Sequence, residues 1–506
     1  MTTTGGQLAG SAGIQQSESQ RADAEARQRR GTRQLLIARA VFMVFGYLSS
    51  VILARGLGPA EFGVYGVLLA TLVWLEMVSY AGIPAAISRL IPHHLAETRD
   101  VESSGRFLLL ITSATLFIIA WLLAPTIARL FQLQDGARLV RLAVLDIPFA
   151  AAYQGYNGIL MGNRRFGLLG VSQAILGAAK LIGVTALLLI GMSVEYALIA
   201  NVAASAAALL FLIVRRPPSG FRPAAGFLRR ILVIALPMGA FYAALQILIS
   251  LDLWSLGSLW HGDAAVLGQY VAALKIAQTL IVIPMVQSGV LLASVSWALA
   301  SGDRVGARRH VLEASRFALI LSAAACAVVG GSAAPLMGLI YSAAFSAGGP
   351  FLILQLVAFS CFAFMDAFAH ALMAAGRQRT TAAVLVSFIP VVLVANILLI
   401  PRLGPMGAAV SLLIGMLGVS LVTGIVTWWE FGCPFALRTV ARVAAAAVPV
   451  VLLGVWLPVS GPVVLIKMAV LGGLYLLLLK LMGEITAADF SLPQIRAVAH
   501  TAAPSE

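Results

Sequence analysis

The chain has 506 residues, of which 60% are hydrophobic and only 11% are charged, and its mean hydropathy is +0.97. In soluble domains about a quarter of the residues are charged. This composition therefore excludes a soluble fold and indicates a membrane protein with many spans. The formal net charge of +14 does not indicate nucleic-acid binding, because basic loops that orient a chain in the membrane account for it.

Apolar runs of roughly bilayer length recur along the chain. They are continuous rather than alternating, which predicts membrane-spanning helices and not the strands of a barrel. We therefore expect an all-α polytopic membrane protein with about 14 transmembrane helices. Their expected ranges are 35–54, 63–82, 107–127, 140–161, 166–190, 195–214, 231–256, 266–296, 312–341, 350–374, 380–400, 406–428, 439–457 and 463–482.

Polar stretches between the runs predict the domain boundaries. The stretch from Arg215 to Arg230 is basic and rich in Pro and Gly, which indicates a joint between two halves. The expected segments are a disordered cytoplasmic tail at 1–32, an N-terminal six-helix bundle at 33–214, a basic cytoplasmic linker at 215–230, a C-terminal six-helix bundle at 231–430, two extra transmembrane helices at 431–485 and a cytoplasmic tail at 486–506. Most loop Lys and Arg lie on the side of the two tails, which predicts cytoplasmic termini.

Short motifs repeat at equivalent places in the two halves. Phe62-Gly63-Val64-Tyr65 follows the first span of the first half, and Leu267-Gly268-Gln269-Tyr270 follows the first span of the second half. Repeated motifs in corresponding loops are typical of transporters built from internal repeats. The pattern favours a duplicated six-helix unit with two added helices.

Two longer stretches resemble a known family. The turn Arg55-Gly56-Leu57-Gly58-Pro59-Ala60-Glu61-Phe62-Gly63-Val64-Tyr65 resembles the loop after the first helix in bacterial polysaccharide exporters and lipid-linked oligosaccharide (O-antigen type) flippases. The stretch from Asn396 to Ala409 resembles the link between helices eleven and twelve of the same family. That family belongs to the multidrug/oligosaccharidyl-lipid/polysaccharide exporter superfamily, and the resemblance covers approximately residues 33–485.

This resemblance implies an architecture and a cargo. It implies two six-helix bundles arranged as a V around a central cavity that opens alternately to the cytoplasm and the periplasm of a bacterial inner membrane. The implied cargo is an undecaprenyl-diphosphate-linked oligosaccharide for O-antigen, capsule or exopolysaccharide synthesis. Implied partners are membrane lipid, a polysaccharide polymerase and a co-polymerase, and no nucleic acid.

Lys180 is the first candidate for binding such a cargo. A charge inside a span costs about 2.5–3.5 kcal/mol on insertion scales, so a charged residue there is expected to have a functional role or a structural partner. Lys180 lies midway along its span, and Gln173 and Gly177 share its helical face. Two roles fit: the ammonium contacts the cargo diphosphate, or it pairs with a carboxylate on a neighbouring helix.

Arg39, Lys275 and Gln278 extend the set of candidate diphosphate ligands. Arg39 lies about one turn into the first span, where it either snorkels to the interface or captures phosphate. Gln278 follows Lys275 by three residues and extends its polar face. We expect Lys275 to pair with Asp252, as a structural salt bridge or as a gate that opens on the external side.

Three further residues are candidates for coupling or gating. Asp366 precedes His370 by four residues on one helical face, which fits a proton-binding couple or a structural hydrogen bond. Asp146 lies two residues before Pro148, which predicts a broken or kinked span whose freed carbonyls could help hold a cation.

Two other charged residues have simpler expectations. Arg316 follows Glu313 by one turn, which predicts a local ion pair. Lys467 lies near the external end of the last span and is expected to snorkel.

No catalytic motif accompanies these candidates. The sequence has no GxxxxGK[ST], HExxH or GxSxG, and its three cysteines have no metal-ligand spacing. We expect no enzyme, no catalytic residue, no metal site and no cofactor, with Na⁺ and H⁺ both open as coupling ions. The leading hypothesis is a lipid-linked oligosaccharide flippase. The alternatives are a multidrug cation antiporter of the same superfamily and a non-transporting scaffold of a polysaccharide synthase.

Overall fold

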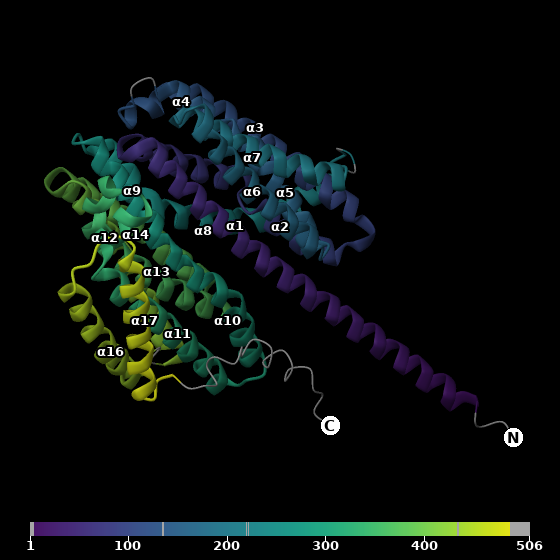
Figure 1. The fold of residues 1–506 in the computed structure, drawn as a ribbon. Coiled ribbons are helices and arrows are strands. Elements are labelled where there is room, and N and C mark those ends of the chain that lie inside the picture. The colour runs from purple at the N-terminus through teal and green to yellow at the C-terminus, as the bar shows by residue number, and fades with distance from the viewer. Residues whose placement is uncertain (1–4, 134–135, 219, 221, 433–434, 486–506) are drawn as a thin grey trace. The chain divides into compact units, whose positions relative to one another are not determined.

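The computed structural model describes residues 5–133, 136–218, 220, 222–432 and 435–485, and these residues fold into helices and short connections (Figure 1). Twelve of the described helices are long and apolar enough to cross a membrane. The chain is therefore an all-α multi-pass membrane protein, as its composition predicted. The expected tail at 486–506 and Cys433 lie outside the described residues.

The chain packs into two compact units. Unit 1 comprises residues 1–57 and 67–246, and unit 2 comprises residues 58–66 and 247–506. Unit 1 contains most of α1 (Gly5–Tyr80), then α2 (Ile83–Leu90), η1 (Ile91–His93), η2 (Leu95–Glu97), α3 (Thr98–Leu130), α4 (Gly136–Val144), α5 (Asp146–Gly162), α6 (Phe166–Ile190), α7 (Val194–Arg215) and the first part of α8 (Ala225–Leu259).

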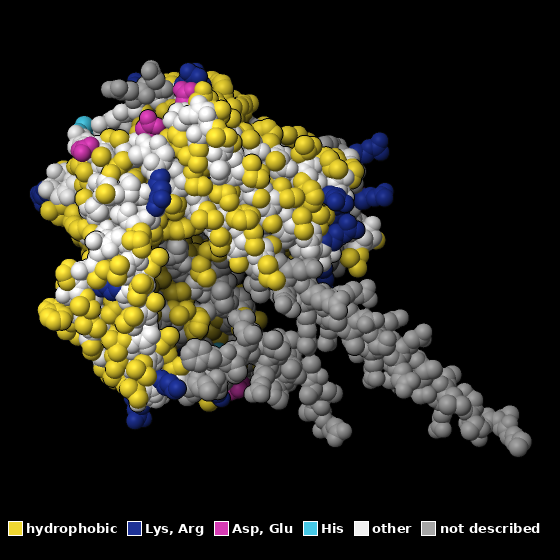
Figure 2. Space-filling view, in the orientation of Figure 1, with side chains coloured by type: hydrophobic (Ala, Val, Ile, Leu, Met, Phe, Trp, Pro, Cys, Tyr) yellow, Lys and Arg dark blue, Asp and Glu magenta, His cyan; other side chains and the backbone are white. Residues whose placement is uncertain are grey.

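Unit 2 contains the rest of α8 and the helices that follow it. These are α9 (Ala264–Ala277), η3 (Gln278–Ile281), α10 (Val282–Ala300), α11 (Arg304–Gly330), α12 (Ala333–Ile340), η4 (Ala343–Gly348), α13 (Gly349–Ala374), α14 (Gln378–Leu403), α15 (Pro405–Phe431), α16 (Leu437–Trp456) and α17 (Val463–Leu481). Figure 2 shows the apolar surface that such spans present to lipid.

Two structural details explain why the structure has twelve long helices although 14 spans were expected. The first two expected spans both lie in α1, which breaks at Gly58, where φ is 74° and ψ is 172°. Glycine adopts a positive φ at little cost, and Pro59 follows it. The expected span at 140–161 is divided into α4 and α5 around Leu145, so the predicted break near Asp146 is present and neither piece reaches span length.

The beginning of α1 differs from the expectation for the N-terminal tail. The helix begins at Gly5, so it includes most of the segment 1–32 that we expected to be disordered. This segment is rich in Ala, Gln and Arg, which have high helix propensity. The lack of an apolar face argued against packing, but it does not prevent a helix from forming.

The two repeated motifs meet within unit 2. A Cβ atom on Gly268 would lie 1.7 Å from the Pro59 carbonyl oxygen, and one on Gly63 would lie 2.8 Å from the Gly268 nitrogen. Both values are far below van der Waals contact, so the two backbones cross where only glycine fits. This contact explains why residues 58–66 belong to unit 2 although they precede most of unit 1 in the chain.

The border between the units lies inside α8. Its first turns carry Phe227, Ile231 and Ala235, which pack with Ile83 and Ile87 in the core of unit 1. From residue 247 onward the helix packs with unit 2. The expected bundle boundaries around 215–230 remain predictions, but the change in packing partners occurs later in the chain.

Two charged residues attach α16 and α17 to the rest of unit 2. Lys467 is buried, and its Nζ donates to the carbonyl oxygens of Gly331, Gly454 and Leu457 at 3.1, 2.6 and 2.8 Å. These carbonyls close the C-terminal ends of α11 and α16, where helices lack internal donors. The expectation that Lys467 snorkels was therefore wrong, because unpaired helix carbonyls lie within its reach.

Glu484, just after α17, accepts hydrogen bonds from Arg316 at 2.9 Å, Arg442 at 3.1 Å and Thr439 at 3.0 Å. The expected local pair of Arg316 with Glu313 was wrong, since Glu313 pairs with Arg309 at 2.8 Å. We call Arg316, Thr439, Arg442 and Glu484 the Glu484 cluster.

Candidate functional sites

A series of polar contacts lies inside unit 1 around Lys180. The Lys180 Nζ donates to Asn201 Oδ1 at 2.7 Å, and Asn201 Nδ2 donates to Asp146 Oδ2 at 2.6 Å. These residues come from α6, α7 and the first turn of α5. The ammonium therefore interacts with a carboxylate through an amide rather than directly.

Glu76 of α1 adds a second carboxyl group, and we call Glu76, Asp146, Lys180 and Asn201 the Lys180 cluster. The carboxyl groups of Glu76 and Asp146 and the ammonium of Lys180 are close enough to interact electrostatically. Two carboxylates and one ammonium together carry one negative charge. Because a net charge inside a membrane is costly, this arrangement is suited to hold one further proton or cation.

Three other expected residues of this half lie on α6 and α1. Gly177 shares its helical face with Gln173 and Lys180, and a Cβ on Gly177 would lie 3.3 Å from Phe42 Cα of α1. At the level of this glycine, the face is therefore covered by α1. Arg39 lies half-buried on the same helix. The roles of Arg39, Gln173 and Lys180 in binding cargo remain predictions.

Asp252 of α8 is fully buried in unit 2. One of its oxygens, Oδ2, accepts a hydrogen bond from the hydroxyl of Tyr270 on α9. The expected salt bridge to Lys275 was wrong, because the tyrosine occupies the position beside the carboxylate. Lys275 Nζ instead lies 3.5 Å from Gln278 Oε1, so the predicted proximity of these two side chains is present.

The surroundings of Asp252 contain more hydrogen-bond acceptors than donors. Gln355 Nε2 donates to the Tyr270 carbonyl at 3.5 Å, and Asn396 Nδ2 donates to the Leu251 carbonyl at 3.4 Å. Asp252 Oδ1, Gln355 Oε1 and Asn396 Oδ1 are buried and have no hydrogen-bond donor among the described residues. We call Asp252, Tyr270, Gln355 and Asn396 the Asp252 cluster.

Oxygen ligands of this kind suit a hard cation such as Na⁺. The described residues contain no group of three or more His, Cys, Asp or Glu that could hold a metal. The atoms without donors in the Asp252 cluster are one carboxylate oxygen and two amide oxygens.

Asp366 and His370 form a pair on α13. His370 Nδ1 lies 3.2 Å from Asp366 Oδ2, which also accepts a hydrogen bond from Ser288 Oγ of α10 at 2.6 Å. The same His370 nitrogen lies 2.8 Å from the Asp366 carbonyl oxygen. The expected contact on one helical face is present, whereas its role in proton coupling remains a prediction.

Sequence reasoning overlooked the neutral members of these clusters. Asn201, Tyr270 and Gln355 each lie inside a long apolar helix and were not candidates. A signal for them existed, because a polar side chain in a span requires a partner just as a charged one does. The distances between helices, which identify each partner, are not encoded in local spacing.

Comparison with known proteins identifies the family to which the chain belongs. The profile of the family described as "Polysaccharide biosynthesis protein" matches residues 29–295, which is more than half of the chain. A Shigella flexneri protein assigned as an O-antigen transporter is 26% identical over 162 residues, 28% of this chain and 37% of the relative. Stage V sporulation protein B of Bacillus subtilis (strain 168) is 26% identical over 203 residues, 37% of this chain and 38% of the relative. The matched stretches thus span less than two fifths of either relative.

Solved structures share the fold at low sequence identity. The lipid II flippase MurJ in an inward closed conformation has a TM-score of 0.72 and 15% identity, covering 88% of this chain and 97% of that one. An inward-facing multidrug resistance MATE family transporter of the MOP superfamily has a TM-score of 0.65 and 16% identity, covering 81% and 98%. At such identities the likeness shows that the chain shares the fold of these structures and nothing about its cargo.

Proposed function

The chain belongs to the polysaccharide biosynthesis protein family, and from that premise we propose that it is a lipid-linked oligosaccharide flippase. It would translocate an undecaprenyl-diphosphate-linked oligosaccharide across a bacterial inner membrane by alternating access, without catalysing a reaction. The product would serve O-antigen, capsule or exopolysaccharide synthesis, and a polysaccharide polymerase and co-polymerase would use it next. Both chain termini would face the cytoplasm, following the distribution of Lys and Arg.

The observation that carries this proposal is the Lys180 cluster. An ammonium inside the membrane is retained only where it has partners and a use. Lys180 is held by the neutral amide of Asn201 at 2.7 Å rather than by direct contact with a carboxylate. An amide leaves more of the positive charge available than a salt bridge would, and a compact ammonium can bind a diphosphate and later release it. A proton or cation held by Glu76 or Asp146 would first cancel the net negative charge of the Lys180 cluster, so that an anion could approach the ammonium. Arg39 and Lys275 would supply further positive charge along the path.

Coupling to an ion gradient would use the buried acidic residues. The Asp252 cluster has the oxygen ligands for a monovalent cation, and Asp366 with His370 has the chemistry for a proton. Either ion would give the transporter a source of free energy, and the sequence lacks the phosphate-binding motif GxxxxGK[ST]. We favour a cation at the Asp252 cluster, because its acceptors exceed its donors.

The multidrug cation antiporter is the second candidate. It is supported by the shared fold with MATE family transporters and by the carboxyl groups of Asp146, Asp252 and Asp366 inside apolar helices. The added helices α16 and α17 argue for the flippase, because the drug exporters of the superfamily that the sequence resembles typically have twelve helices. A non-transporting scaffold would pair all of its buried charges, and the donor-free Asp252 Oδ1 does not fit it.

The test is complementation of a bacterial strain that lacks its own O-antigen flippase. The full chain should restore surface polymer and deplete the pool of lipid-linked intermediates on the cytoplasmic face. Lys180→Ala should reduce polymer by at least about tenfold at equal membrane levels, because a charge-assisted hydrogen bond of roughly 1.5–3 kcal/mol is lost.

Lys480→Ala is the matched control, since it removes an exposed lysine at the end of α17 and should leave polymer unchanged. Unchanged polymer with Lys180→Ala would exclude the proposed role of that ammonium. Resistance to cationic drugs without any restored polymer would favour the antiporter instead.

A further inference from the structure

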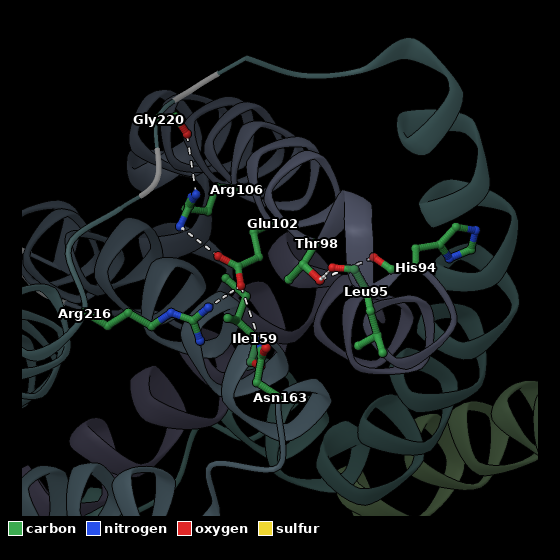
Figure 3. A network of polar contacts seen from close by, with 9 residues as sticks. All are labelled: His94, Leu95, Thr98, Glu102, Arg106, Ile159, Asn163, Arg216 and Gly220. Atoms are coloured by element: carbon green, nitrogen blue, oxygen red, sulfur yellow. Dashed lines mark hydrogen bonds and ion pairs between the residues drawn. The ribbon is translucent and has the colours of Figure 1, made fainter.

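A second polar cluster lies at the end of unit 1 where α3 begins and α7 ends. Glu102 of α3 is 3% exposed, and its carboxylate binds Arg216, Arg106 and Asn163. Figure 3 shows both guanidinium groups directed at the Glu102 carboxylate, with Arg106 above Arg216 in this view. The Arg106 Nη2 also lies 3.5 Å from the Gly220 carbonyl, and Ser104 Oγ accepts from the Ala224 nitrogen at 3.0 Å. One buried carboxylate thus helps fasten the basic segment after α7 to α3.

Donors outnumber acceptors around this carboxylate. Tyr156 of α5 is only 4% exposed, and its hydroxyl has no hydrogen-bond partner among the described residues. Arg216 Nη1 is likewise buried and has no acceptor in the described part of the chain. Arg106, Arg216 and Glu102 are the charged groups that act on the Tyr156 hydroxyl. Buried donors without acceptors are rare, so a missing acceptor is the physical explanation for both.

The net charge of the cluster also favours an anionic ligand, as the free donors do. Two guanidinium groups and one carboxylate leave one positive charge at the cluster. A buried positive charge without a counter-charge is costly, and a ligand with a single negative charge would neutralise it. A phosphodiester carries one negative charge, and its oxygens accept the kinds of hydrogen bond that Arg216 and Tyr156 can donate.

The position of the cluster identifies the source of that anion. It lies at the ends of two helices of membrane-spanning length, α3 and α7. Apolar side chains along these helices face outward, with Leu110 on α3 55% exposed and Val214 on α7 70% exposed. Acyl chains can lie against such residues while a headgroup reaches the half-buried Arg216. Exposed arginines beside it, such as Arg215 and Arg222, raise the local concentration of anions.

We infer that Arg216 and Tyr156, together with Arg106, form a binding site for the phosphodiester headgroup of an anionic membrane phospholipid. The headgroup would complete the hydrogen bonds that Glu102 leaves open. It would hold the segment after α7 against α3 from the membrane side. This site is separate from the Lys180 cluster, and its test does not depend on the transported cargo.

The test uses purified full-length protein in detergent, titrated with short-chain phosphatidylglycerol and followed by native mass spectrometry. Tyr156→Phe removes the free hydroxyl and keeps the ring, and we expect about tenfold weaker binding of the lipid. The matched control is Tyr153→Phe, one turn earlier on α5, because the Tyr153 hydroxyl already lies 3.4 Å from Ser172 Oγ. The control should bind as tightly as the wild type.

Two further probes identify the source of the anion. Pyrophosphate represents a soluble anion, and a short-chain diacylglycerol represents the acyl chains without phosphate. Tighter binding of pyrophosphate than of phosphatidylglycerol would overturn the assignment to lipid, and so would equal binding of diacylglycerol. Arg216→Gln is the second variant, with the same expected loss. Equal lipid binding by the wild type and both variants would overturn the site itself.

Discussion

The polar residues around Glu102 in unit 1 and the Asp252 cluster in unit 2 both contain buried hydrogen-bonding atoms without partners, but these atoms are of opposite kinds. Around Glu102, the buried atoms without partners are donors, on Tyr156 and Arg216. Around Asp252, they are acceptors, on Asp252, Gln355 and Asn396. Unmet donors favour an anion and unmet acceptors favour a cation. The comparison shows that the sign of the charge on a missing ligand can be inferred from the buried hydrogen-bonding atoms. The net charge of +14 describes the whole chain and does not distinguish the two sites.

The largest expected effect comes from removing the charge in the acceptor-rich cluster. Asp252→Asn keeps the shape of the side chain but cannot balance a bound cation, so transport of polymer precursor should fall by at least about tenfold. The wild type should also melt at a higher temperature in NaCl than in choline chloride, and this difference should disappear in the variant. Asp263→Asn, at the exposed N-terminus of α9, is the control and should change neither quantity. Transport and salt dependence equal to wild type would remove the basis for a cation at this cluster.

Removing the donor rather than the acceptor sharpens the comparison. Tyr270→Phe deprives Asp252 of its hydroxyl partner, so the free energy of unfolding should fall by roughly 1–3 kcal/mol. The stabilisation by Na⁺ should persist, because the three acceptor oxygens remain. Thermal unfolding in NaCl and in choline chloride measures both effects. Tyr65→Phe is the control, since the buried Tyr65 hydroxyl has no partner among the described residues. A loss of Na⁺ stabilisation in Tyr270→Phe but not in Tyr65→Phe would contradict the expectation.

The Glu484 cluster is an intermediate case in which a carboxylate has donors on several sides. Burial would raise the pKa of Glu484, but hydrogen bonds from Arg442, Thr439 and Arg316 outweigh it and lower the pKa below 4.5. A lowered pKa in the folded state gives stability that is present above the unfolded value and is lost as pH falls through the folded value.

We therefore expect Glu484→Gln to lower the free energy of unfolding by about 1–2 kcal/mol at pH 7. The difference from wild type should shrink as the pH falls below 4.5. Melting curves of both proteins across this range measure it. A difference that stays constant with pH would show that the carboxylate charge contributes nothing to the attachment of α17.

The smallest effect is expected at an exposed ion pair. Arg309 and Glu313 are 2.8 Å apart, but both side chains are more than half exposed. Water and salt screen such a pair, so Arg309→Ala should change the free energy of unfolding by at most about 0.5 kcal/mol. The same melting assay detects it. A change as large as that of Glu484→Gln would show that proximity, and not burial, determines these energies.

Much of the fold follows from the sequence because apolar runs of bilayer length have few alternatives to helix. All 14 expected spans correspond to helices of the structure, including the broken one at α4 and α5. The break itself was visible at Asp146 and Pro148. What the sequence does not encode locally is pairing between helices: Asp252 meets Tyr270 instead of Lys275, and Arg316 meets Glu484 instead of Glu313.

The candidate sites show the same limit. Lys180, Asp146 and Asp252 were identifiable because a charge in a span is conspicuous. Asn201 and Tyr270 were not, since a single amide or hydroxyl in an apolar helix is common. Periodicity places residues on one face of one helix, and it cannot state which neighbouring helix that face contacts. The cluster around Glu102 was missed for the further reason that it lies where a span ends, among charges that all resembled loop residues.

The crossing of Gly63 and Gly268 also has a consequence for biosynthesis. About 200 residues separate these glycines, and at a synthesis rate of about 5–20 residues per second the second arrives roughly 10–40 seconds after the first. During that interval the segment 58–66 lacks the partner against which it packs, although the helices beside it are already being inserted. Unit 2 therefore cannot be completed from the later half of the nascent chain alone. The segment 58–66, made near the start of translation, must therefore stay available until the later half of the chain supplies its partner.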